Sequence, residues 1–359
     1  MSAQVATSAW QCARAWLQAV FGTAPPRQAE RPRQARAAAD LATERLPLGQ
    51  VHAQLQQGLH ALALSPRQAS EDEPAGAAAL EQAVVQALLA RDWASRQLPR
   101  RPQLLPQLIQ TVNDDAGSAR VMAAIIGQDP VLTGNLLRIA NSPAYKVHER
   151  PVESLQRAVT LVGTEGVRQI ISAVLVQPVM EVQCPQFPQF SSIIWEHALL
   201  ASRGAADHAR AVSGGDAFAA QWLGLTQGLG TALVMRQLTQ LASAGGQEIP
   251  TALALRLLQR WSLPVAQRVA AAWELPEPVH PALQAQASGP LAASLRFGSA
   301  AAAASLLCRH GRATQGQMLA LLEQSPDVPL HALRWAWRRL HGRSVETLGD
   351  VDEATCPPA

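Results

Sequence analysis

The stretch from residue 129 to residue 142 reads DPVLTGNLLRIANS, and it decides how the rest of the chain is interpreted. An aspartate followed by a proline is a helix start signal, because the carboxylate accepts backbone N–H bonds and proline needs no donor in the first turn. Leu132, Leu136 and Ile139 then recur on one helical face. The closing Asn-Ser-Pro sequence disfavours further helix, since the residue before a proline avoids the helical conformation. The stretch therefore predicts a capped helix that ends in a turn.

The segments that follow carry the same kind of helix signals. Ser154 precedes a run of periodic apolar residues that Gly163 ends, and Thr164 can cap the next helix. Alanine, leucine, glutamine and arginine outnumber the β-branched residues, which favours helix over sheet. We find no convincing strand hairpin, so we predict an all-α architecture. Further helices are predicted at residues 190–212, 216–238, 252–258, 264–273, 291–310 and 330–341.

Several sequence blocks, in a fixed order, resemble one protein family. The first is the stretch at 129–142, and SLQRAVTLVG follows it at 154–163. Trp-Glu-His at 195–197, GLTQGLG at 224–230 and WSLP at 261–264 complete the series. Together they resemble the HDOD family, the bacterial HD-related output domain, over residues 96–310. The resemblance implies a multi-helix bundle related to the core of HD phosphohydrolases, and an output or scaffold role in bacterial signal transduction.

The resemblance also identifies the positions where HD phosphohydrolases bind metal. Those enzymes use a histidine, then an adjacent His-Asp pair, then a further aspartate. In this chain the first histidine corresponds to His197, but Gln227 and Gly228 stand in place of the pair. Glutamine ligates metal weakly and glycine has no side chain, whereas metal catalysis needs several anionic or imidazole ligands. We therefore expect no catalytic activity, no bound metal and no cofactor, with His197 buried or capping. The alternative is a residual metal-dependent phosphohydrolase that uses His197 with ligands at other positions.

The chain divides into three parts by composition. Residues 1–95 are rich in alanine, glutamine and arginine, and predict a helical N-terminal extension whose function the sequence does not indicate. Residues 96–310 form the HDOD domain, which we expect to be separable from the extension. Residues 311–359 contain a basic amphipathic helix and a tail.

Two groups of polar residues are candidates for an interaction surface. The turn after the DPVLT helix and the C-terminal helix, residues 330–341, each place polar or basic side chains where a signalling partner of unknown identity could bind. The C-terminal helix could also bind a membrane surface or nucleic acid, or it could dock on its own bundle with its arginines facing water, which we favour. The candidate residues are Arg138, Asn141, Ser142, Tyr145, Arg334, Arg338 and Arg339.

Overall composition limits the classes of partner and the location. The net charge of +3 is small, and the chain offers no platform of stacking aromatics, so a nucleic-acid-binding regulator is the less favoured alternative. The four cysteines are scattered without a CxxC pair, which is typical of free thiols in a reducing compartment. We expect no membrane span, because no apolar run reaches the required length, and no secretory signal peptide. We expect a cytoplasmic protein.

Overall fold

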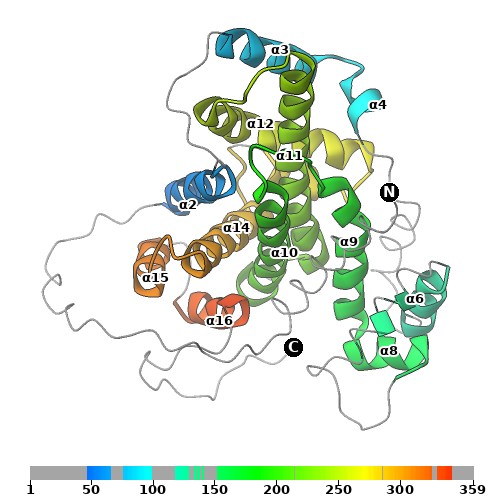
Figure 1. Cartoon of the computed structure of the whole chain (residues 1–359). Helices are drawn as coiled ribbons and strands as arrows, with labels where there is room; N and C mark the ends of the chain where they lie inside the picture. Colours follow the sequence, from blue (N-terminus) through cyan, green and yellow to red (C-terminus); the bar gives the residue numbers. More distant parts are fainter. Residues whose placement is uncertain are drawn as a thin grey trace, which may run out of the picture.

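A computed structural model of the chain describes residues 47–65, 76–98, 118–128, 133–134, 136–137, 140, 152–213, 215–284, 286–325 and 330–341. Within those ranges all regular structure is helical, which confirms the predicted all-α class (Figure 1). The helices are α2 (Leu48–Ala63), α3 (Ala77–Leu89), α4 (Trp93–Gln97), α6 (Ser118–Ile126), α8 (Leu155–Val162), α9 (Thr164–Met180), α10 (Phe190–His208), the π-helix η2 (Ala209–Ser213), α11 (Ala217–Ala244), α12 (Thr251–Ala272), α13 (Val279–Ala282), α14 (Pro290–Arg309), α15 (Gln315–Glu323) and α16 (Leu330–His341).

Helix boundaries follow the capping signals at residues 154 and 216, whereas the helix after Gly163 begins at Thr164 itself and has no side-chain cap. The Ser154 hydroxyl accepts a hydrogen bond from the Arg157 backbone N–H, and Asp216 does the same for Phe218 and Ala219, so both predicted starts are confirmed. Residues 251–272 form one helix rather than the two expected, with Pro264 inside it. The DPVLT stretch lies largely outside the described residues.

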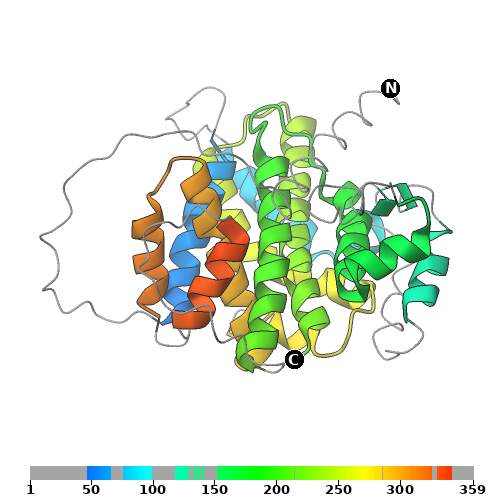
Figure 2. The same ribbon diagram turned by 90° about the horizontal axis from the view of Figure 1, so that it is seen from below.

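The main core is built around α10, α11, α12 and α14, which lie side by side at the centre of the molecule (Figures 1 and 2). Helices α10 and α14 pack with their backbones in contact at Gly298. A Cβ atom there would lie 2.3 Å from the backbone nitrogen of Ala205, so no larger residue fits without moving a helix. The five consecutive alanines at 300–304 point to all sides of α14 and are all buried. Small residues therefore determine how closely the central helices pack.

Helix α2, from the predicted N-terminal extension, is part of this main core. Val51, Leu55 and Leu59 are almost completely buried in the same hydrophobic cluster as α10, α11 and α14, and α2 lies mainly against α14. A boundary between residues 95 and 96 stays a prediction about how the chain divides. The packing, however, gives α2 no core of its own, which argues against a freely separable extension.

A second, smaller hydrophobic cluster lies at the other end of the molecule from α2, α15 and α16 (Figures 1 and 2). It is formed by α6, α8 and the first half of α9, with Met122, Ile126, Val159 and Ile171 at its centre. The second half of α9 belongs to the main core through Val176 and Met180. Helix α9 thus connects the two clusters.

Helix α14 differs from the sequence expectation that no segment is apolar enough for a membrane span. Pro290–Arg309 has the length and apolar composition for one, but 78% of its apolar window is buried inside the protein. Its contacts with α10, α2 and α15 account for this composition, because core helices are apolar on most sides.

Candidate functional site

His197 lies in the middle of α10, and its side chain is held by two other helices. Its Nε2 atom lies 3.1 Å from the backbone oxygen of Ser299 on α14 and 3.1 Å from the amide nitrogen of Gln56 on α2. The Gln56 amide also donates to the Ser299 hydroxyl oxygen at 2.9 Å. The histidine is buried, as expected from the sequence, and it links α10, α14 and α2.

His197 is neutral, and its Nε2 atom is hydrogen-bonded within the protein in either tautomer. Burial lowers the pKa of His197 to about 4, and the hydrogen bond to Ser299 opposes this shift only in part, so the ring is neutral near pH 7. A neutral imidazole nitrogen either carries a hydrogen or presents a lone pair. With a hydrogen, Nε2 donates to the Ser299 carbonyl, and with a lone pair it accepts from Gln56. Either tautomer uses this nitrogen within the chain.

Helix α2 brings two further histidines to the same region. His52, Gln56 and His60 are spaced four residues apart and therefore share one face of α2. Burial lowers the pKa of both His52 and His60 to about 3, and the neighbouring His197 contributes to each shift. All three rings are consequently neutral. His52 Nε2 and His60 Nδ1 are buried without a hydrogen-bond partner among the described residues.

Gln227 and Gly228 lie on α11, opposite α10. A Cβ atom at Gly228 would lie 2.5 Å from the Cβ of Ala198, the residue after His197, and 3.0 Å from the terminal methyl of Met180. Gly228 therefore packs against α10 one residue from His197. Gln227 is buried, and its side-chain oxygen has no partner among the described residues.

These residues do not fit the metal-binding set of HD phosphohydrolases. The aspartate position is a glycine with no room for a side chain, the histidine before it is a neutral amide, and His197 Nε2 is engaged by the chain. His208 cannot share an ion with His197, because eleven residues of helix separate the two by about 16 Å along α10. The sequence analysis did not identify Gln56, which lies 141 residues before His197.

The C-terminal helix α16 docks on the bundle, as the favoured interpretation of the sequence has it. Leu333, Trp337 and Leu340 are buried, and the Arg309 guanidinium donates to the Leu340 carbonyl at 2.6 Å. Of the α16 arginines, Arg338 and Arg339 are exposed and Arg334 is half-buried.

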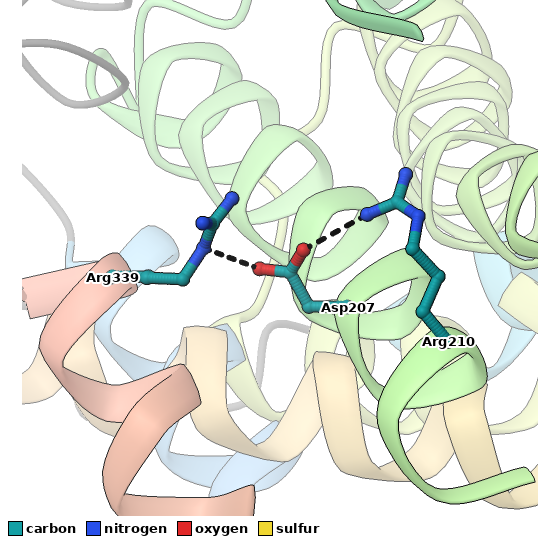
Figure 3. Close-up of polar contacts among 3 residues, drawn as sticks. All are labelled: Asp207, Arg210 and Arg339. Carbon is teal, nitrogen blue, oxygen red and sulfur yellow. Dashed lines mark hydrogen bonds and ion pairs between the residues drawn. The ribbon is translucent and has the colours of Figure 1, made fainter. Parts of the chain in front are cut away.

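The three candidate arginines of α16 do not form one free surface. The Arg339 Nε atom lies 2.9 Å from the carboxylate of Asp207, which also binds Arg210 (Figure 3). Arg334 lies 4.0 Å from Glu323, and Arg338 is exposed. The sequence analysis missed Asp207, although a lone acidic residue within the apolar, small-residue run of α10 was the available signal. The remaining candidates, Arg138, Asn141, Ser142 and Tyr145, lie outside the described residues.

The fold and the site together define a class: a helical bundle in which Gln227 and Gly228 stand at the two positions aligned with the His-Asp pair of HD enzymes. The HDOD domain family matches residues 98–288, more than half of the sequence, and the chain belongs to that family. No curated protein matches the chain.

Solved structures show a similar fold. A "Putative metal-dependent phosphohydrolase" from Shewanella amazonensis SB2B is 19% identical with a TM-score of 0.50, and the match covers 73% of this chain and 98% of that one. An HDOD domain protein with unknown function from Geobacter sulfurreducens is 21% identical with a TM-score of 0.49, over 72% and 89% of the two chains. A "Putative signal transduction protein" from Marinobacter aquaeolei VT8 is 17% identical with a TM-score of 0.49, over 74% and 64%.

Proposed function

We propose that this HDOD protein is a non-catalytic component of bacterial signal transduction, an output or scaffold module that acts by binding other proteins in the cytoplasm. The observation that supports the proposal is the hydrogen-bonded group of Gln56, His197 and Ser299, in which His197 is the residue aligned with the first metal ligand of HD enzymes. A side chain of the protein's own helix α2 engages the histidine that a metal would need.

The chemistry of the neighbouring positions supports the same proposal. A hydrolytic metal site lowers the pKa of a bound water, and this requires several ligands that hold the ion in place. Gln227 supplies a neutral amide, and the absence of room beside Gly228 excludes an acidic side chain at that position. Membership of the HDOD family supports a signalling role for the chain.

The experiment that tests the absence of catalysis is metal analysis combined with a hydrolysis assay. We expect the purified chain to hold no stoichiometric transition metal and to leave a phosphodiester such as bis(p-nitrophenyl) phosphate intact in the presence of added Mn²⁺. His197→Ala is the matched control. Metal bound at one ion per chain and removed by His197→Ala would contradict the proposal, as would hydrolysis that this substitution abolishes.

The experiment that tests the binding role is partner capture from the native host with the full chain. We expect capture to depend on the polar surfaces identified from the sequence, namely the turn at 141–146 or the arginine face of α16. Arg334→Glu with Arg338→Glu tests the helix, and Tyr145→Ala tests the turn, each in protein checked by circular dichroism. Binding through the helix should weaken steeply as ionic strength rises. If only His197→Ala or Gln227→Ala reduces capture, the function belongs to the buried site instead.

A further inference from the structure

Asp207 is a buried acidic residue at the junction of three elements. It lies near the end of α10, where the chain continues as the π-helix η2, and α16 packs beside it. Its side chain is 1% exposed, and its two carboxylate oxygens bind Arg339 of α16 at 2.9 Å and Arg210 of η2 at 3.2 Å (Figure 3). Single π-helical turns are rare and frequently occur at functional sites, and this one places Arg210 beside the carboxylate.

Burial and the neighbouring arginines have opposite effects on the pKa of Asp207. Burial raises the pKa of Asp207, while Arg339, Arg203 and Arg210 each lower it and only partly offset the effect of burial. Removing a carboxylate from water is costly, so the chain maintains this group at the expense of stability. The guanidinium groups of Arg339, Arg203 and Arg210 therefore all act on this one buried carboxylate.

The Arg339 guanidinium is held in a fixed orientation. Its Nε atom is engaged by Asp207, and its central carbon lies 4.9 Å from the centre of the Trp335 ring. The two terminal nitrogens point away from Asp207 (Figure 3), and no described residue hydrogen-bonds to them. Arg339 and Arg210 remain 42% and 40% exposed. The junction therefore presents an oriented pair of terminal N–H groups to solvent, the geometry that binds a carboxylate in bidentate fashion.

We propose that this arginine junction, formed by Arg210 and Arg339 over Asp207, is the docking site for an acidic segment of a partner protein, which binds through an aspartate or glutamate carboxylate. The proposal rests on the binding role proposed above and specifies the chemistry of the partner. Asp207 acts as a positioning residue beneath the arginines and does not itself contact the partner.

The described surroundings favour a protein carboxylate over nucleic acid or lipid. Arg339 covers the Trp335 ring, so the ring is not available to stack on a base. Leu333, Trp337 and Leu340 of α16 face the bundle and are buried, so the helix does not present a broad apolar face to a membrane. The net charge of +3 is also small for a protein that binds a polyanion.

The test is a titration of the full-length protein with a fluorescein-labelled oligoglutamate peptide at low ionic strength, followed by fluorescence polarisation. An oligoglutamine peptide is the uncharged control. Arg210→Gln should weaken binding about tenfold, because a charge-assisted hydrogen bond contributes on that scale. Arg260→Gln removes the same charge from the exposed surface of α12 and should change binding less than about twofold, since an exposed charge away from the contact contributes little.

Two conservative variants keep the test independent of folding. Arg339→Lys retains a cation beside Asp207 but removes the planar pair of donors, and should weaken binding while α16 stays docked. Asp207→Asn keeps one acceptor oxygen, which can hold Arg339 or Arg210 but not both, and removes the competing negative charge, so it should strengthen peptide binding. Circular dichroism and the melting temperature check that both variants are folded.

Several outcomes would overturn the proposal. The first is that oligoglutamate does not bind. The second is that Arg210→Gln and Arg260→Gln reduce the affinity for the peptide equally. The third is that Asp207→Asn, in a folded protein, does not increase that affinity. Preferential binding of anionic lipid vesicles or single-stranded DNA, lost with Arg210→Gln, would likewise overturn it by assigning the junction to another class of ligand. Metal analysis and the hydrolysis assay are unaffected by any of these results, so failure of this proposal is distinguishable from failure of the proposed function.

Discussion

Acidification should destabilise this protein through two buried histidines, His60 of α2 and His197 of α10. His60 and His197 are 4% and 3% exposed, and burial lowers the pKa of His60 to about 3 and of His197 to about 4. In the unfolded chain both should titrate near 6.5. The unfolded state therefore binds more protons than the native state at mildly acidic pH. The stability from these two groups is complete above pH 6.5 and is lost progressively as the pH falls toward the folded values.

The size of the effect follows from the separation between the two pKa values. A pH of 5 is about 1.5 units below the pKa of a histidine in the unfolded chain. Protonation of that histidine then stabilises the unfolded state by about 2 kcal/mol per group. His60 and His197 together should cost about 4 kcal/mol, a large part of the 5 to 15 kcal/mol typical of a folded domain. His52 shifts in the same direction but is partly exposed, so its contribution is smaller. Burial raises the pKa of Asp207, which has the opposite sign because the protonated carboxyl favours the native state.

Urea unfolding at pH 7.5 and pH 5, followed by circular dichroism, measures this effect. The wild-type free energy of unfolding should fall between the two conditions, and His60→Gln should reduce the fall by about 2 kcal/mol because glutamine does not titrate. His310→Gln is the matched control, since His310 is exposed on the loop after α14 and should leave the fall unchanged. A wild-type protein equally stable at both pH values would refute the reasoning. An equal response of the His60 and His310 variants would do the same.

Two further predictions concern the packing of the site. Gln227→His with Gly228→Asp should fail to create a metal site and should lower the melting temperature, because a side chain at residue 228 would lie within 2.5 Å of the Ala198 Cβ and overpacking typically costs about 1 to 3 kcal/mol. A stable double variant that binds one metal ion would show that α10 and α11 separate more easily than their contact indicates. Removing residues 1–95 should prevent cooperative unfolding of the remainder, because α2 leaves with Val51, Leu55 and Leu59 of the main core. A truncated chain that gives a single sharp calorimetric transition would restore the boundary at residue 96.

Local signals in the sequence predicted much of the helical structure. Ser154 and Asp216 cap their helices as expected, because a cap acts over two or three residues. The break expected between residues 258 and 264 does not occur, since tertiary contacts of α12 with α11 and α2 maintain the helix through Pro264. The family blocks identified His197, Gln227 and Gly228 as the aligned positions, and in the structure Gly228 packs against Ala198, the residue after His197.

The partners of the site residues could not be predicted in this way. Gln56 and His197 are far apart in sequence, and the periodicity of α2 shows a face but not the helix that covers it. The contact between Asp207 and Arg339 could not be predicted for the same reason. The two residues are 132 positions apart, and the basic pattern of the helix that contains Arg339 suggested a solvent-facing surface. Buried polar contacts between distant helices depend on the assembled fold.

The contact between Gln56 and His197 also makes a return to metal binding difficult in evolutionary terms. A lineage that regained the His-Asp pair would still have a histidine engaged by α2 and no space beside Ala198. Replacing Gln56 first would remove the Gln56–His197 contact and leave the buried His197 with one fewer polar neighbour, which lowers stability before any ligand is gained. Each single substitution along this route is therefore disadvantageous by itself. The contact between Gln56 and His197 and the close packing at Ala198 would therefore oppose a return to metal binding, even without selection on another function.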